Sequence, residues 1–271
     1  AMAEGFLRET VGAWPALHSA DAKHMLFNAV LPAVGGTKPV RRSGFGPRLI
    51  YVVGGCGAGG TLSTAEVYDP QNASWKQLVS MMGPRSVHSC VAFEGKLYAV
   101  GGRGAGSQAL DTAEVYDPQT DGWQPLAKMT TARVALGLAA VGGKIYAIGG
   151  WDSSLALESV EAYDPQLGAW ALVASMSGKR NSHASVVLGG KIYVMGGLDE
   201  DDELDTVEVY DPQANSWQRV ASMPQGRYWH AAAAMGGKIY VTGGEGQERA
   251  VNSTVFVYDP QANAWTQLAS M

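Results

Sequence analysis

Residues 191–223 read KIYVMGGLDEDDELDTVEVYDPQANSWQRVASM, and the order of features in this stretch decides the fold. Lys191 to Met195 and Val207 to Tyr210 are short apolar runs rich in β-branched residues, which predicts two strands. The pair Gly196-Gly197 lets the backbone bend sharply out of the first strand. Asp211-Pro212 presets a turn after the second strand. The stretch is therefore typical of a small antiparallel sheet.

The same order of features recurs five times along the chain, at a spacing of 47 or 48 residues. Each unit has a tyrosine three residues before a Gly-Gly pair, then Tyr-Asp-Pro-Gln, a tryptophan seven residues after that second tyrosine, and a closing methionine. The glycine pairs begin at Gly54, Gly101, Gly149, Gly196 and Gly243, and the tryptophans are Trp75, Trp123, Trp170, Trp217 and Trp265. One such small sheet cannot bury both of its faces alone, and repeated sheets of this kind stack radially into a β-propeller.

This pattern resembles the kelch repeat, whose period lies near 50 residues. The resemblance implies an all-β fold class, a kelch-type β-propeller of five recognisable four-stranded blades over residues 48–271. The innermost strand of the first unit is doubtful, because residues 38–46 (KPVRRSGFG) lack the apolar pattern. Kelch propellers usually close by pairing strands from the two chain ends, and this sequence stops where another innermost strand would begin. A five-blade ring and an incomplete six-bladed ring therefore both stay open.

Residues 1–47 differ from the rest and predict a short N-terminal helix and a linker. Apolar positions within residues 22–31 (AKHMLFNAVL) follow helical spacing, Ser19 or Asp21 could cap the helix, and Pro32 follows it. A helix ending in Leu-Pro before a basic linker resembles the end of the BACK-like region in BTB-BACK-Kelch proteins. The alternative is a helix that packs on the propeller or on a partner.

Composition narrows the classes of partner. The net charge is −5 and the sequence pI is about 5.5, which argues against binding nucleic acid. No apolar run approaches the roughly 18 residues of a membrane span. Cys56 and Cys90 are too few for a disulfide framework, so we expect a reducing, cytoplasmic environment.

Most aromatic residues are explained by the repeat, and the exceptions suggest a binding surface. Trp14, Trp151, Tyr228 and Trp229 lie outside the periodic positions. In kelch propellers the position after Gly-Gly and the position four residues after the methionine lie at one face, around the central axis, where many members bind a partner peptide. We call this predicted surface the rim. The resemblance assigns to it Arg85, Arg103, Arg133, Trp151, Arg180, Arg227, Tyr228, Trp229, His183 and His230.

The chemistry of these residues suggests the partner. Arginine binds carboxylates through two parallel hydrogen bonds, and Trp, Tyr and Arg are enriched in binding hot spots, so we expect an acidic peptide segment of another protein. Alternatively, the arginines pair with neighbouring loop acids and hold the blades in register. Glutamates two residues before each Tyr-Asp, at 66, 114, 161 and 208 with Phe256 in the last unit, also indicate a structural pair. The acidic run Asp199–Glu203 is either a solvated loop or an attraction for a basic partner.

Catalytic and cofactor motifs are not found. Residues 55–60 (GCGAGG) formally match G-x-G-x-x-G, but no helix is expected after them to bind a phosphate. We therefore expect no cofactor, no metal and no enzymatic activity. A sugar-acting kelch enzyme would have to use His88, His183, His230 and Glu245 with the arginines.

The leading functional hypothesis is a protein-protein interaction module. The resemblance further implies substrate recognition for a cullin-type ubiquitin ligase, through a region outside this chain. The alternative is a structural or scaffold subunit of a larger assembly, or an actin-associated cytoskeletal protein.

Overall fold

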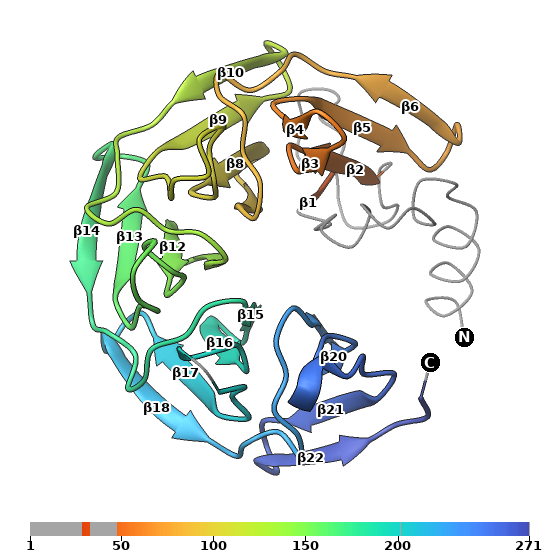
Figure 1. Ribbon diagram of the computed structural model, residues 1–271, viewed down its shortest axis with the longest axis vertical. Helices are drawn as coiled ribbons and strands as arrows, with labels where there is room; N and C mark the ends of the chain where they lie inside the picture. The colour runs from red at the N-terminus through yellow and green to blue at the C-terminus, as the bar shows by residue number, and fades with distance from the viewer. Residues whose placement is uncertain (1–28, 33–47, 201, 271) are drawn as a thin grey trace, which may run out of the picture.

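The computed structural model describes residues 29–32, 48–200 and 202–270. They form five four-stranded antiparallel sheets arranged around a common axis, which confirms the predicted kelch-type β-propeller with five blades (Figure 1). Within these residues the only helical element is the 3₁₀ turn η3 (Gln247–Arg249), and a small hairpin of β3 (Cys56–Gly57) and β4 (Gly60–Thr61) projects from the first blade. No helix in the described ranges has the length and apolar character needed to cross a membrane.

Each blade is numbered here in chain order, and its strands run from the central axis outward. Blade 1 contains β1 (Ala29–Pro32), β2 (Arg48–Val53), β5 (Ala65–Asp69) and β6 (Ser74–Gln77). Blade 2 contains β7 (Ser89–Phe93), β8 (Lys96–Val100), β9 (Ala113–Asp117) and β10 (Gly122–Pro125). Blade 3 contains β11 (Gly137–Val141), β12 (Lys144–Ile148), β13 (Val160–Asp164) and β14 (Ala169–Val173). Blade 4 contains β15 (Ala184–Leu188), β16 (Lys191–Met195), β17 (Val207–Asp211) and β18 (Ser216–Val220), and blade 5 contains β19 (Ala231–Met235), β20 (Lys238–Thr242), β21 (Val255–Asp259) and β22 (Ala264–Gln267).

In blades 2, 3 and 4 the second strand is buried on both faces, because a neighbouring blade covers each face. In β16, the four consecutive residues from Ile192 to Met195 are all buried. Such a strand shows a continuous apolar run instead of alternation, as expected for a sheet packed on both sides. The last strand of each blade is mostly exposed, as in β6 and β18.

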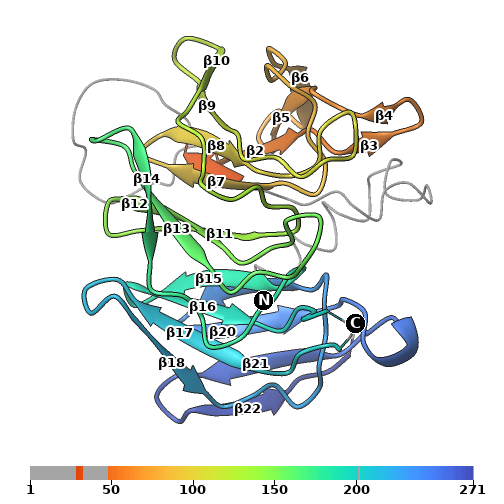
Figure 2. The same cartoon turned by 60° about the vertical axis from the view of Figure 1, so that its left-hand side comes forward.

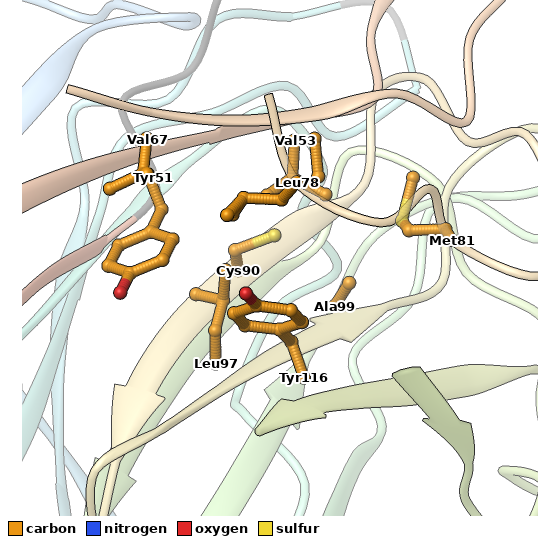
Figure 3. Packing of buried hydrophobic residues seen from close by; sticks show 10 residues of the cluster. Tyr51, Val53, Val67, Leu78, Met81, Cys90, Leu97, Ala99 and Tyr116 are labelled. Atoms are coloured by element: carbon orange, nitrogen blue, oxygen red, sulfur yellow. The ribbon is translucent and has the colours of Figure 1, made fainter. Parts of the chain in front are cut away.

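The hydrophobic core lies between the blades. Tyrosines from the second strand of one blade and the third strand of the next approach each other, with ring centroids 6.1 Å apart for Tyr51 and Tyr116 and 5.6 Å apart for Tyr146 and Tyr210. Figure 3 shows the cluster between blades 1 and 2, in which Cys90 and Leu97 lie among the aromatic rings. Burial raises the pKa of the Cys90 thiol to about 12, so this cysteine is an unreactive part of the core.

The described ranges include only the last residues of the predicted N-terminal helix, so the helix itself stays a prediction. Residues 29–31 were expected to end a helix, but they belong to β1, which pairs with β2 in antiparallel register with Ala29 opposite Tyr51. Residues 29–32 (AVLP) form the innermost strand of blade 1, a place for which residues 38–46 had been considered. This pairing provides hydrogen-bond partners for the backbone groups at the inner edge of β2. The remainder of the predicted helix, the linker and the boundary at residue 47 lie outside the described residues.

The described residues of the five blades form an arc. The inner strands β1, β7, β11, β15 and β19 follow one another around the axis, each next to its predecessor. Blade 1 and blade 5 lie at the two ends of this arc in both views (Figures 1 and 2). Blade 5 is correspondingly more exposed: four of the five residues of β19 are exposed, whereas no residue of β15 is.

Candidate partner-binding rim

Four of the predicted rim arginines lie beneath the surface. Their exposed fractions are between 0% and 3%, for Arg85, Arg133, Arg180 and Arg227. In blades 2, 3 and 4 the guanidinium pairs with the periodic glutamate on the third strand, at 2.9 Å to Glu114, 3.0 Å to Glu161 and 2.8 Å to Glu208. These four side chains are therefore buried beneath the rim, and their role in partner binding stays a prediction. In blades 2, 3 and 4 the acid that pairs with the arginine comes from a strand instead of a loop.

Each arginine joins two blades, as Arg133 illustrates. Its backbone N–H donates to the carbonyl of Leu110, and its own carbonyl accepts from the N–H of Gly102, both in blade 2. Its guanidinium donates instead to blade 3, to the carbonyl of Gly149 at 2.8 Å and to Glu161. Desolvation lowers the pKa of Arg133, and Glu161 acts against that shift. Arg133 therefore connects blades 2 and 3: its main chain forms hydrogen bonds with blade 2, and its charged side chain binds blade 3.

Blade 5 replaces this ion pair with different chemistry. Phe256 occupies the glutamate position, and the Arg227 guanidinium carbon lies 4.7 Å from the centre of its ring, a cation–π contact. In blades 2 to 4 the glutamate also accepts a backbone N–H from the residue after the methionine, for example Thr130 to Glu161 at 2.7 Å. Pro224 holds that position before blade 5 and has no N–H to donate. Blade 5 therefore lacks both the glutamate carboxylate that would accept this hydrogen bond and the backbone N–H that would donate it.

The predicted rim histidines His183 and His230, with His88, are buried at the seams between blades. Their exposed fractions are 8%, 7% and 3%. Within the described chain no ring nitrogen of the three has a hydrogen-bond partner. Burial, with a contribution from the nearby arginine, lowers the pKa of His88 and of His230 to about 3. The histidines are therefore neutral parts of the packing, and Leu136 takes the same position in blade 3.

Arg103 and Trp151 do lie on the rim. Each follows a Gly-Gly pair and forms an isolated β-bridge with the residue after the buried arginine, Ser86 and Val134 respectively. Arg103 is exposed, and its guanidinium carbon lies 5.7 Å from the centre of the Trp151 ring. These two predicted residues therefore come together from neighbouring blades as one cationic and aromatic surface. Leu198 and Glu245 occupy the equivalent positions in blades 4 and 5.

Trp229 is the most exposed aromatic residue of the predicted site. Its side chain is 52% exposed, and its backbone is left-handed with φ +52°. A bulky residue in this region is uncommon, which is a reason to look for function. Tyr228 is buried beside it, with ring centroids 5.2 Å apart, and its hydroxyl donates to Glu245 at 3.0 Å.

The left-handed geometry of Trp229 is shared by every described blade junction. Val87, Ala135 and Ser182 hold the equivalent positions with φ between +50° and +54°. The N–H of Ala135 donates to Val87, that of Ser182 to Ala135, and that of Trp229 to Ser182, each at 2.9 Å. This hydrogen-bonded arc fixes the backbone at the start of the inner strands. Sequence reasoning missed it, because no residue type marks these positions.

The acidic loop of blade 4 lies next to the Tyr228–Trp229 pair. Glu203 packs against Gly226, where an added Cβ would meet its side chain at 2.8 Å. Glu200 pairs with Lys179 at 3.2 Å, and both side chains are exposed. Burial chiefly raises the pKa of Tyr228, with smaller contributions from Glu245 and Glu203. The loop is therefore solvated for the residues described, and it gives this side of the rim negative charge.

Nowhere in the described ranges do three His, Cys, Asp or Glu residues form a group that could hold a metal.

The chain is a kelch-type β-propeller, a protein-interaction fold. It combines the four-stranded sheets with the repeated Gly-Gly and Tyr-Asp-Pro sequences and with the contacts that join neighbouring blades. Residues 50–271 match the protein-family model described as the Attractin/LZTR1 beta-propeller, and the chain belongs to that family.

Curated relatives match over short stretches. An F-box/kelch-repeat protein of Arabidopsis thaliana is 51% identical over 55 residues, which are 20% of this chain and 15% of that protein. Kelch-like protein 7 of Rattus norvegicus is 46% identical over 46 residues, 17% of this chain and 8% of the relative. Kelch-like ECH-associated protein 1A of Danio rerio is 35% identical over 100 residues, 36% of this chain and 16% of the relative. These matches span less than a fifth of the length of each relative.

One solved structure supports the fold. The structure of YjhT superposes with a TM-score of 0.72 at 15% sequence identity, covering 82% of this chain and 81% of that one. At this identity the likeness concerns the fold alone.

Proposed function

We propose that the chain is a protein-interaction module that holds a segment of a partner protein against the rim. The observation that carries the proposal is the exposure of Trp229 and Arg103, with Trp151 under the guanidinium, at positions where the repeat requires no such residue. Tryptophan and arginine are the residue types that dominate binding hot spots. A rigid backbone beneath them, fixed by the arc of Val87, Ala135 and Ser182, reduces the entropy lost on binding.

The proposed acidic segment of the partner now depends on fewer residues. Of the five predicted arginines, Arg103 is the one whose side chain is exposed. A carboxylate of the partner would bind Arg103 over the Trp151 ring, where the stacked guanidinium is already oriented. The rest of the segment would extend toward Trp229.

The partner is identified first by affinity purification and mass spectrometry. The parent chain is compared with the double variant Trp151→Ala/Trp229→Ala and with Leu167→Ala. Leu167 is a matched control because it is 78% exposed in the turn between β13 and β14, away from the rim. We expect a direct partner that is lost in the double variant and retained in the control.

The purified partner then tests the chemistry. Trp229→Ala and Arg103→Glu should each weaken binding in calorimetry by about 2 kcal/mol, and Arg103→Glu should also reduce the dependence on salt. Binding that is unchanged in both variants would contradict the proposal and favour a scaffold role through other surfaces.

For the cellular role, we propose recognition of substrates for a cullin-type ubiquitin ligase in the cytoplasm, through a region outside this chain. Support comes from the names of the matched relatives, an F-box/kelch-repeat protein and two kelch-like proteins, over partial lengths. The protein at its natural length should co-purify with a cullin when expressed in cells, and its rim partner should accumulate when the protein is depleted. A natural-length protein that recovers its rim partner without any cullin would contradict this role.

We propose no enzymatic activity for the chain. Burial of His88, His183 and His230 at the blade seams supports this, since a catalytic acid or base must reach a substrate. Turnover of a sugar by the purified chain would contradict it.

A further inference from the structure

We propose that the chain forms a weak two-fold dimer in which the outer strand β14 of blade 3 pairs with β14 of a second copy. The proposal rests on how the backbone and the side chains of β14 differ from those of the other four outer strands. It is independent of the function proposed for the rim.

The backbone of β14 leaves one edge of its sheet available for pairing. β14 is the last strand of the sheet, and Val173 lies opposite Val160 of β13. At the position equivalent to Val173, the backbone N–H donates to the third strand of the same blade, as in Leu78, Leu126 and Leu268. Successive residues of a strand direct their backbone groups to opposite sides, so the N–H and C=O groups of Trp170 and Leu172 face away from the sheet. Within the described part of the chain, none of these four groups has a hydrogen-bond partner.

The side chains of β14 lack the features that protect the other outer strands. Charged residues and proline usually protect an exposed strand edge from pairing. In the other four blades the two residues that follow the outer tryptophan are polar or proline. They are Lys76 and Gln77, Gln124 and Pro125, Gln218 and Arg219, and Thr266 and Gln267. In blade 3 they are Ala171 and Leu172, which are both exposed, Leu172 to 62%.

The sequence of this edge fits a second copy of itself. A two-fold axis through an antiparallel pair places a strand opposite itself, so a charged residue at the centre would face an identical charge. Residues 166–175 (QLGAWALVAS) contain no charged side chain. One register uses all four outward backbone groups. It places Trp170 opposite Leu172 of the second copy, Leu172 opposite the second copy's Trp170, and the two Ala171 residues opposite each other on the axis.

The same register brings apolar side chains together. Trp170 and Leu172 project from the same face of β14, because they are two residues apart. The Trp170 indole N–H donates to the carbonyl of Ala127 at 3.0 Å, and the ring centroid lies 5.2 Å from that of Tyr163. Leu172 of the second copy would therefore cover an aromatic ring that is already held in place, which is a favourable cross-strand pair. The two-fold axis repeats this contact.

The place of β14 in the fold allows a second copy to approach. Figure 1 shows β14 on the outer perimeter of the arc, between β10 and β18. A single strand edge buries little surface, and interfaces that bury less than about 1,200 Å² are weak or transient. We therefore expect a dimer that forms only at high protein concentration.

The test measures the oligomeric state of the full chain by sedimentation velocity from about 1 μM to about 1 mM. Ala171→Lys and Ala171→Glu each place like charges on the axis, and Lys76 shows that blade 1 accepts a lysine at this position. Gln218→Lys is the matched control, because it adds the same charge at the equivalent position of β18. Leu172→Pro removes one outward N–H, as Pro125 does in blade 2. Urea unfolding checks that each variant is folded.

We expect dimers in the parent and in Gln218→Lys. Dimerisation should be at least about fivefold weaker in Ala171→Lys, Ala171→Glu and Leu172→Pro. An equal mixture of Ala171→Lys and Ala171→Glu should recover the dimer, because opposite charges then meet on the axis. Amide exchange at Trp170 and Leu172 should slow as the parent is concentrated.

A parent that stays monomeric at about 1 mM would overturn the proposal, and so would a dimer that Ala171→Lys leaves unchanged. A mixture that fails to recover the dimer would contradict the pairing of β14 with itself. Protection of the Trp170 and Leu172 amides by the rim partner, in a chain that stays monomeric, would assign this edge to that partner and refute the dimer.

Discussion

At the scale of single residues, charge buried between blades is the chief specific interaction of this propeller. Arg133 and Glu161 are both fully buried, so removing the glutamate leaves the guanidinium without the carboxylate that compensates its charge. Glu161 also accepts the N–H of Thr130 and of Thr131. Breaking such a pair from one side leaves an uncompensated charge, which is more costly than the pair is stabilising.

We therefore predict that Glu161→Ala lowers the free energy of unfolding by about 3–5 kcal/mol. The measurement is urea denaturation followed by tryptophan fluorescence. Lys128→Ala is the control, because its pair with Asp111 is exposed and should contribute less than about 1 kcal/mol. Similar midpoints for the two variants would show that the buried arginine finds other compensation.

The seam histidines predict acid sensitivity. The pKa of His230 is about 3 in the folded chain, because burial disfavours the charged form and Arg227 is close by, whereas an unfolded histidine titrates near 6.5. Since the folded pKa is the lower one, the unfolded chain binds the proton first. Stability is complete above about pH 6.5 and falls as the pH drops toward 3, by about 2 kcal/mol per such histidine at pH 5.

His230→Leu tests this without opening a cavity, since Leu136 is tolerated at the equivalent position of blade 3. The difference in unfolding free energy between pH 7 and pH 5 should shrink by about 2 kcal/mol in the variant relative to the parent. An undiminished difference would place the acid sensitivity in other groups.

At the scale of strands and blades, the periodic features were predictable because each residue type meets a structural requirement that recurs in every blade. Gly54 has φ +63°, and a Cβ there would meet the carbonyl oxygen of Arg85 at 2.5 Å, so glycine is required by the close approach of two blades. Such positions repeat with the blade, and the sequence therefore shows them. The exposure of the predicted site residues was harder to predict, because it is decided by their neighbours in space: both Arg85 and Arg103 were assigned to the rim, yet Arg85 is buried and Arg103 is exposed.

The inner strand of blade 1 could not be predicted for a related reason. Residues 29–32 pair with a strand that begins at Arg48, and their apolar spacing within residues 22–31 also fits a helix. A four-residue strand is determined by the sheet edge available to it, which is a tertiary effect. The helical spacing was therefore real but was overridden at residues 29–31.

The outer tryptophan should be the main contact of each outer strand. Trp217 donates to the carbonyl of Ala174 at 2.8 Å, and its ring lies 5.0 Å from that of Tyr210. We predict that Trp217→Ala lowers the free energy of unfolding by about 3 kcal/mol and Trp217→Phe by about 1 kcal/mol, since phenylalanine keeps the packing and loses one hydrogen bond. Thermal and chemical unfolding of both variants measure this. A Trp217→Ala variant as stable as the parent would mean that the indole is dispensable.

At the scale of the whole molecule, an arc of five blades should have uneven stability. In a repeat array each unit is stabilised by its neighbours, so an end unit with one covered face is the easiest to open. Blade 3 lies between two neighbours and joins blade 4 through the Arg180–Glu208 pair, whereas blade 5 has Phe256 in place of a glutamate and an exposed β19.

Native-state hydrogen exchange should resolve this difference. Amides of β20 and β21 should exchange through local opening at a lower free energy than those of β12 and β13, which should exchange only near global unfolding. Phe256→Glu is a useful second variant. It places a carboxylate near Arg227, but Pro224 supplies no N–H to its second oxygen, so we expect no gain in the protection of blade 5. Equal protection of the amides from exchange in all blades would contradict this prediction. It would show that the five blades unfold as one cooperative unit.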